Sequence, residues 1–345
     1  MNETTGLRVV VTGATGNVGT SVVRALADDP QVGSVLGLAR RVPELTLPRT
    51  EWAAVDLGED DNGDGLAGHF AGADAVVHLA WRFQPTHDPV VTWQTNVLGS
   101  IRVFKAVAVA GVPALVHASS VGAYSPGPKE APGVDESWPT HGWPDAAYCR
   151  EKAYLERVLD TYEYEHPHVR VVRMRPAFLF KETSASEQRR IFAGRFLPGP
   201  LVRPDLLPWV PDLKGLVLQA LHTDDAAEAY RQAVVREVSG AFNLAADPVV
   251  DARVLGELLE AKVVRVPTGV VRAALAAAWS AHLAPASPHL FDAVLRLPVL
   301  DSSRARRELD WQPLRTSTDA IREFLDGVRK GSGEETAPLA GRKAS

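Results

Sequence analysis

The pair of residues best suited to chemistry in this sequence is Tyr148 and Lys152, which lie four positions apart in the segment Tyr-Cys-Arg-Glu-Lys. On a helix, this spacing places both side chains on the same face. A free phenol has a pKa of about 10, so it is a poor base at neutral pH. A neighbouring ammonium favours the phenolate, and lowering the pKa to about 7 requires roughly 4 kcal/mol of differential stabilisation. One close, partly desolvated charge pair can supply that amount.

Ser120 offers a second hydroxyl, directly after an apolar run at 114–118 that predicts a buried strand. Ligands collect at the carboxyl ends of such strands. We expect Tyr148 to exchange a proton with an alcohol or carbonyl oxygen while Ser120 hydrogen-bonds the same oxygen. The Tyr148–Lys152 spacing alone also describes an ordinary amphipathic helix pair. Combined with Ser120 and a glycine-rich segment, it predicts an oxidoreductase, and Cys149, which points to another face, is interpreted as structural.

The glycine-rich segment lies between a predicted strand at 7–11 and a predicted helix that begins at Val18. Gly13 permits the tight turn out of the strand, and Gly16 lets backbone amides approach a pyrophosphate. Gly19 allows the helix and the strand to pack closely. The N–H groups and the dipole of the helix start favour an anion. This arrangement predicts a dinucleotide site, although the spacing is Gly-x-x-Gly-x-x-Gly rather than Gly-x-Gly-x-x-Gly.

Short apolar runs alternate with helical patterns along the first half of the chain. Strands are expected at 35–38, 53–55, 74–79, 114–118 and 169–174, with helices at 90–110 and 146–164. This alternation predicts an α/β fold: a doubly wound parallel sheet (Rossmann-type) with a smaller C-terminal substrate lobe. Residues 1–176 are expected to form the dinucleotide-binding domain, to which the chain returns around 215–245. Residues 177–330 would form mainly the substrate lobe, and 331–345 a disordered tail.

Composition narrows the class of partner. A net charge of −5 with no long basic run argues against nucleic acid as the main partner. No signal segment and no membrane span are evident, and the single cysteine fits a reducing compartment, so a cytoplasmic location is expected. The ten histidines show no metal-ligand spacing, so no metal site is predicted.

The end of the second predicted strand bears on the choice of cofactor. NAD-binding chains usually place Asp or Glu there to bond the ribose 2′-hydroxyl. Here Ala39 is followed by Arg40 and Arg41. Arginine can hold a 2′-phosphate with two parallel hydrogen bonds, which favours NADP over NAD. The alternative is a pair of solvated loop arginines.

Several motifs together resemble the extended short-chain dehydrogenase/reductase family, in its NAD-dependent epimerase/dehydratase branch. They are TGATGNVG (12–19), Asp56-Leu57, His78-Leu79-Ala80, Asn96 in TNVLGS, SSVGAY (119–124) and YCREK (148–152). The resemblance continues through RPAF (175–178), LHTDDAAEAY (221–230), FNLA (242–245) and LDSSRARRELDWQP (300–313), so it covers nearly the whole chain.

The resemblance implies a role for each matching residue. Ser120, Tyr148, Lys152 and Asn96 would form the catalytic set, with Lys152 also binding the nicotinamide ribose and Asn96 kinking its helix. The cofactor-binding residues would be Gly13, Thr15, Gly16, Asn17, Val18 and Gly19 at the pyrophosphate, Arg40, Asp56, Leu57, Leu79 and Ala80 at the adenosine end, and Tyr148, Lys152 and Pro176 at the nicotinamide end. A homodimer through the helices at 90–110 and 146–164 is also implied.

Departures from the family pattern limit the choice of reaction. Val121-Gly122 follow Ser120, where a sugar-nucleotide 4,6-dehydratase would carry an acidic pair, so a dehydratase is not expected. The expected function is an NAD(P)-dependent oxidoreductase that moves hydride between nicotinamide and a secondary alcohol or carbonyl of a small molecule. The alternatives are a nucleotide-sugar epimerase with tightly bound NAD, and a non-catalytic dinucleotide sensor. Basic residues at 189, 190, 195 and 203, in the expected second lobe, are candidate contacts for a substrate phosphate or carboxylate, with a solvated face as the alternative. The tryptophans at 81, 138, 143 and 209 are candidate walls for a hydrophobic substrate, with core packing as the alternative.

Overall fold

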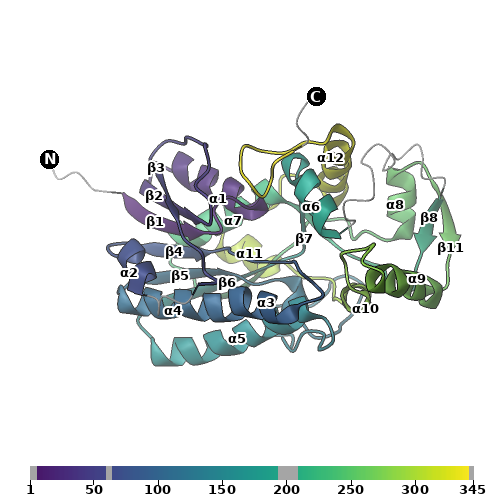
Figure 1. Ribbon diagram of the computed structural model, residues 1–345, viewed down its shortest axis with the longest axis horizontal. Helices are drawn as coiled ribbons and strands as arrows, with labels where there is room; N and C mark the ends of the chain where they lie inside the picture. The colour runs from purple at the N-terminus through teal and green to yellow at the C-terminus, as the bar shows by residue number, and fades with distance from the viewer. Residues whose placement is uncertain (1–5, 60–63, 193–208, 342–345) are drawn as a thin grey trace.

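A parallel seven-stranded sheet organises the molecule (Figure 1). The computed structural model describes residues 6–59, 64–192 and 209–341. The strand order is β10-β6-β5-β4-β1-β2-β3, and every pairing is parallel. The strands are β1 (Leu7–Thr12), β2 (Val32–Ala39), β3 (Thr50–Ala54), β4 (Ala75–His78), β5 (Ala114–Ala118), β6 (Arg170–Pro176) and β10 (Gly240–Leu244). The predicted doubly wound α/β fold is confirmed.

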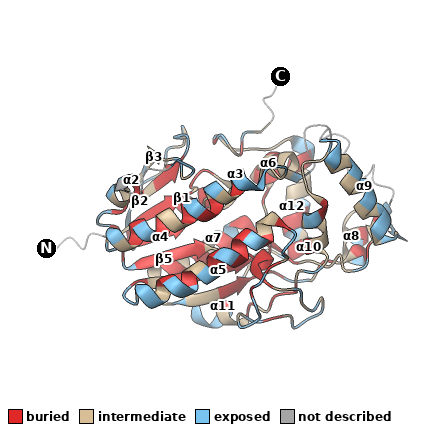
Figure 2. Ribbon diagram, turned by 60° about the horizontal axis from the view of Figure 1, so that its bottom comes forward, coloured by how far each residue is buried: buried red, intermediate tan, exposed pale blue. Residues whose placement is uncertain are grey.

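The alternation of side chains along the central strand explains why helices cover both faces. Val9 and Val11 of β1 contribute to one hydrophobic core and Val10 to the opposite core. Helices α1 (Asn17–Asp28) and α7 (Thr223–Val235) cover the first face. Helices α2 (Asp64–Phe70), α4 (Gly99–Val109) and α5 (Ala147–Glu165) cover the second, as the buried strands behind α4 and α5 in Figure 2 show.

The helix predicted at 90–110 is divided into three pieces. A short helix, α3 (Pro89–Trp93), leads into a wide π-helical turn at Gln94–Leu98 before α4 begins. Asn96 lies in this turn and is buried. A π-helical turn changes the direction of the side chains that follow it, and such turns are frequent at functional sites.

The rest of the chain forms a smaller lobe and then returns to the sheet. Parallel pairs join β7 (Phe178–Phe180) to β9 (Ala220–His222) and β8 (Trp209–Asp212) to β11 (Lys262–Arg265). Helix α7 packs against α1, and β10 pairs with β6. The remaining helices are α6 (Ala185–Phe192), α8 (Ala252–Leu258), α9 (Thr268–Ser280), α10 (Pro288–Val294), α11 (Ser303–Glu308) and α12 (Ser317–Lys330). Within the ranges given above, no helix is both long enough and apolar enough to cross a membrane.

Residues 331–341 are packed against the body of the molecule, contrary to the disorder predicted for this tail. Leu339 is fully buried, and the Thr336 hydroxyl donates a hydrogen bond of 2.9 Å to the carbonyl of Thr15 in the glycine-rich loop. The Glu334 carboxylate accepts hydrogen bonds from Lys181 and Thr183. The composition of this segment is typical of disorder, but two buried side chains and a paired carboxylate hold it in place.

Candidate active site

The glycine-rich loop has the shape needed to hold a diphosphate. Gly13 adopts a φ of +67°, and a Cβ there would lie 2.6 Å from the backbone of Ala80, just after β4. A Cβ on Gly19 would lie 2.2 Å from the Gly13 carbonyl oxygen. At Gly16, by contrast, a Cβ would meet only one atom within 4 Å, so this side of the loop is open. Gly16 caps α1 without a side-chain hydrogen bond, and the first turn carries no acidic residue. The helix start therefore fits an anion.

Ser120 and Tyr148 are brought together at the carboxyl end of β5. Ser120 begins a short 3₁₀ turn (Val121–Ala123), and its oxygen accepts a 3.0 Å hydrogen bond from the backbone N–H of Gly122. The Tyr148 ring lies beside the Ser120 oxygen, since both come within 3.4 Å of the position that a Cβ on Gly122 would occupy. A Cβ on Gly122 would lie 2.7 Å from the Tyr148 ring, so the absence of a side chain there lets the ring reach Ser120.

Burial raises the pKa of the Tyr148 phenol, and the hydrogen bond from Ser120 only partly offsets the increase. The Lys152 ammonium donates to the carbonyl of Ala118 at 2.6 Å. The ammonium also lies 3.4 Å from the centre of the Trp81 ring. Burial lowers the pKa of Lys152 itself to about 7, although Glu151 and Glu156 act in the opposite direction.

Asn96 is joined to Glu151 rather than to Lys152. Its side-chain amide accepts from the Arg82 N–H at 2.7 Å and donates to the Arg82 carbonyl at 2.8 Å. The same amide donates to the Glu151 carboxylate at 2.7 Å, and the Thr92 hydroxyl donates to that carboxylate at 2.6 Å. Burial raises the pKa of Glu151, and these two hydrogen bonds lower it in part. This network ties the wide turn and the loop after β4 to α5.

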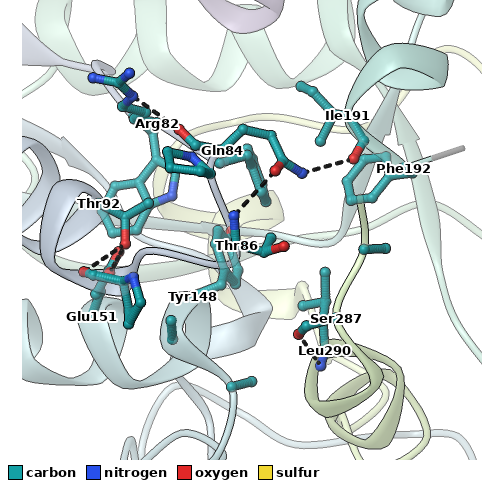
Figure 3. A pocket seen from close by; sticks show the side chains of 17 residues that line it. Arg82, Gln84, Thr86, Thr92, Tyr148, Glu151, Ile191, Phe192, Ser287 and Leu290 are labelled. Atoms are coloured by element: carbon teal, nitrogen blue, oxygen red, sulfur yellow. Dashed lines mark hydrogen bonds between the residues drawn. The ribbon is translucent and has the colours of Figure 1, made fainter. Parts of the chain in front are cut away.

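A cavity opens on the side of Tyr148 that faces α3 and the smaller lobe (Figure 3). Its apolar walls come mainly from Trp81, Phe83, Ile191, Phe192 and Leu290. The Phe83 ring stacks on Tyr148 with 4.8 Å between centroids and 12° between planes, and Trp81 meets Tyr148 edge to face at 5.6 Å. Tyr148 is therefore common to the hydroxyl pair and to the cavity wall.

Comparison with known proteins decides the family. Residues 9–245 match the model of the NAD-dependent epimerase/dehydratase family. The chain belongs to this family. It is 26% identical to UDP-glucose 4-epimerase of Mycolicibacterium smegmatis over 345 residues, which cover 94% of this chain and all of that protein. It is 33% identical to L-arabinose 1-dehydrogenase (NAD(P)(+)) of Haloferax volcanii over 113 residues, or 33% of this chain and 41% of that one.

Solved structures agree in fold. The UDP-glucose 4-epimerase of Thermus thermophilus in complex with NAD has a TM-score of 0.66 and 20% identity, covering 94% of this chain and 99% of that chain. The epimerase/dehydratase family consists of NAD-dependent enzymes of oxidoreductase type, and its model spans the glycine-rich loop, Ser120, Tyr148 and Lys152. It ends before Leu290, so part of the cavity wall lies beyond the segment that the family model matches.

The residues expected at the adenosine end follow the carboxyl ends of β2, β3 and β4, the strands beside β1 and its glycine-rich loop. Arg40 is exposed directly after β2, while Asp56 follows β3 and accepts a hydrogen bond from the Gly58 N–H. Leu79 and Ala80 follow β4, and the Leu79 N–H donates to the Thr12 carbonyl. Pro176 ends β6, paired with Leu244 of β10.

The remaining candidates are the basic residues and tryptophans named as possible substrate contacts, the cysteine and a metal site. Arg190 donates to the carbonyls of Pro338 and Ala340 in the tail, and Arg195 and Arg203 lie outside the described residues. Trp81 lines the cavity, whereas Trp138 and Trp209 are largely exposed. Burial raises the pKa of the Cys149 thiol to about 12, in keeping with a structural cysteine. Within the described ranges, no three His, Cys, Asp or Glu side chains are grouped to hold a metal.

Residues that sequence reasoning did not single out complete the site. Phe83 stacks on Tyr148, and Glu151 accepts a hydrogen bond from Asn96. Phe192 contacts Phe83 and lines the cavity. Glu151 carries a weak signal, since it lies three positions after Tyr148 in the same motif. Phe83 and Phe192 come from segments more than one hundred residues apart and have no shared pattern in the sequence.

Proposed function

We propose that this chain is a dinucleotide-dependent oxidoreductase that moves hydride between nicotinamide and a carbonyl or secondary alcohol of a small molecule. The observation that supports it most directly is the meeting of the Ser120 and Tyr148 hydroxyls beside a cavity at the carboxyl end of β5. In doubly wound sheets this edge is where ligands bind. The glycine-rich loop at the end of β1 opens at the same edge.

The nicotinamide, when bound, supplies or accepts the hydride at the reacting carbon. In the direction of reduction, the Tyr148 hydroxyl donates its proton to the substrate oxygen, and the product is released as the alcohol. Ser120 donates a hydrogen bond to the same oxygen and fixes its position. Burial keeps the Tyr148 phenol protonated until that step because it raises the pKa. Asn96 and Glu151 act as positioning residues, since they hold the loop that carries Trp81 and Phe83 against α5.

We further propose NADP as the preferred cofactor, with NAD as the alternative. Arg40 is exposed at the end of β2, where it is free to approach a 2′-phosphate, and Ala39 leaves no carboxylate for a 2′-hydroxyl. A homodimer through the helices predicted at 90–110 and 146–164 accompanies this proposal. Exposed apolar side chains in these segments support it: Leu98, Val109 and Tyr164.

A second candidate is an epimerase that keeps its cofactor and returns the hydride to the opposite face of the substrate. The full-length similarity to UDP-glucose 4-epimerase favours it. A dinucleotide sensor is the third, non-catalytic possibility; the joined Ser120 and Tyr148 hydroxyls argue against it, because binding alone does not require them.

The test compares the unaltered chain with Tyr148→Phe during incubation with NADPH or NADH and a panel of carbonyl compounds and nucleotide sugars. We expect stoichiometric loss of nicotinamide absorbance, reduced about 10²- to 10⁴-fold in the variant, with cofactor binding retained. Tyr154→Phe, on the exposed side of the same helix, is the matched control. Product inversion without net oxidation would identify an epimerase, and undiminished turnover in Tyr148→Phe would refute the proposal.

A further inference from the structure

The cavity beside Tyr148 has walls in which most polar side chains are already paired, although the Trp81 indole N–H is buried without a partner. The Gln84 amide donates to the carbonyls of Ile191 and Pro285 and accepts from the Thr86 N–H. The Thr86 hydroxyl donates to Pro285 at 2.6 Å, and the Ser287 oxygen accepts from Leu290. These hydrogen bonds close the cavity by joining the loop after β4 to the lobe. They leave few free donors for a polar ligand.

The charges on the described part of the cavity wall are also unsuited to an anionic substrate. Glu151 presents a carboxyl group on α5, bonded to Thr92 and Asn96. Arg82 is the basic residue of this wall, and its Nε donates to the Gln84 carbonyl. Its guanidinium points away from the cavity (Figure 3). A diphosphate is normally held by cations or free amides, and these walls offer neither to the interior.

Aromatic rings dominate the remaining surface. Phe83 lies between Tyr148, on which it stacks, and Phe192, which it meets at 70° with 5.7 Å between centroids. Phe192 is 43% exposed, so its ring is available to a ligand rather than enclosed in the core. A flat apolar group can extend this set of rings while its neighbouring oxygen reaches the Tyr148 hydroxyl.

We infer that the substrate is uncharged and apolar beside its reacting carbon, as in an aryl ketone or the corresponding secondary alcohol. This inference rests on the proposed function and names the substrate class of the same site. The aryl group packs in the cavity against the exposed side of Phe192, next to Phe83, and the oxygen faces Tyr148. The described wall residues offer a nucleotide sugar no cation inside this cavity.

The experiment measures kcat/KM for acetophenone and acetone, with UDP-galactose and UDP-glucose assayed in parallel, using NADPH and NADH. The unaltered chain should prefer acetophenone to acetone at least about tenfold. Phe83→Ala should reduce that ratio about threefold to tenfold. Because both ketones report on one preparation, a loss of folded protein cancels from the ratio. Phe180→Ala, which removes a ring that contacts Phe324 at a tilt of 43°, should leave the ratio unchanged.

The outcomes separate this inference from the proposed function. Equal use of both ketones, or a higher kcat/KM for either nucleotide sugar, overturns the apolar substrate class while oxidoreductase activity stands. If no compound is turned over, the proposed function fails, and binding decides the inference. Saturation-transfer NMR should then show acetophenone bound to the unaltered chain and lost in Phe83→Ala. Absence of that signal in the unaltered chain refutes the inference as well.

Discussion

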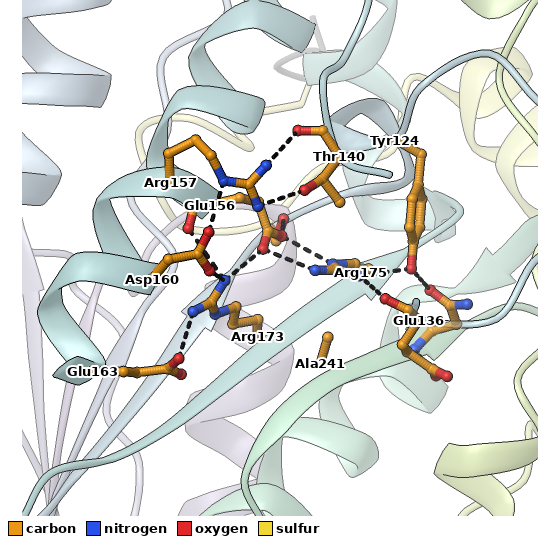
Figure 4. Close-up of polar contacts among 12 residues, drawn as sticks. Tyr124, Glu136, Thr140, Glu156, Arg157, Asp160, Glu163, Arg173, Arg175 and Ala241 are labelled. Carbon is orange, nitrogen blue, oxygen red and sulfur yellow. Dashed lines mark hydrogen bonds and ion pairs between the residues drawn. The ribbon is translucent and has the colours of Figure 1, made fainter. Parts of the chain in front are cut away.

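Replacing Glu156 by glutamine should destabilise the protein strongly, because this buried carboxylate joins α5 to two strands (Figure 4). Its side chain is 1% exposed. Arg175 donates to both carboxylate oxygens at 2.9 Å, and Arg173 donates at 3.0 Å. The Ser119 hydroxyl donates at 2.6 Å, directly before the catalytic candidate Ser120. Glutamine keeps the shape but removes the carboxylate paired with the buried Arg175 guanidinium and one of the three carboxylates paired with Arg173.

The magnitude follows from the carboxyl pKa. Burial alone would raise the pKa of Glu156, but hydrogen bonding and charge from Arg175 and Arg173 outweigh it and lower the pKa from 4.5 to about 2. A shift of this size corresponds to about 3 kcal/mol of folding free energy at neutral pH. Removal of one partner from a buried ion pair has a similar cost of about 3–5 kcal/mol.

The sign of the pH dependence is set by the same shift. A lowered folded-state pKa adds stability that is complete above about pH 4.5 and is lost as the pH falls toward about 2. Urea unfolding should therefore show Glu156→Gln to be about 3 kcal/mol less stable at pH 7, with a smaller difference at pH 3. The control is Glu163→Gln, whose carboxylate also pairs with Arg173 but is 38% exposed and should cost below about 1 kcal/mol. Equal losses in the two variants would refute the reasoning.

Two further predictions concern the ends of the cofactor site. Arg40→Ala should raise the KM for NADPH about tenfold and leave the KM for NADH unchanged, since a charge-assisted pair is lost only with the 2′-phosphate. Arg41→Ala is the control. An unchanged ratio of the two KM values in Arg40→Ala would contradict the NADP preference. Leu339→Ala should lower the free energy of unfolding by about 2–5 kcal/mol, because Leu339 is fully buried. Leu314→Ala, at an 85% exposed position, should change it little in the same denaturation assay.

The parts of the fold that were predictable are those in which local pattern and tertiary role coincide. The apolar run of β1 alternates between two cores, and the glycines after it are the positions where a Cβ would collide with backbone. The long helix around Asn96 was predicted as continuous, because hydrophobic periodicity does not reveal a single widened turn. The tail was expected to be disordered because small polar residues dominate it, yet Thr336 bonds Thr15 far away in the chain and Leu339 is fully buried.

The candidate site was predictable only where one motif carries several of its residues. Strand and helix positions predicted that Ser120 and Tyr148 lie close together, and both side chains lie around Gly122; their catalytic role stays a prediction. The low pKa expected for Tyr148 beside a bound nicotinamide stays a prediction. Helical spacing does not show that the Lys152 ammonium contacts Ala118 and Trp81. The cavity walls depend on loop conformations that bring Phe83 and Phe192 together, and no local rule specifies such a contact.

The hydrogen bond from Thr336 to Thr15 can form only after almost the whole chain has been synthesised. The two residues are 321 positions apart, so the glycine-rich loop emerges from the ribosome long before the hydroxyl that braces its carbonyl has been made. A nascent chain can therefore form the first strand and helix early while its nucleotide cradle still lacks one support. Fusion partners or proteolytic cuts beyond residue 330 that disturb Thr336 therefore affect the glycine-rich loop near the N-terminus, because they remove its hydrogen bond to Thr15.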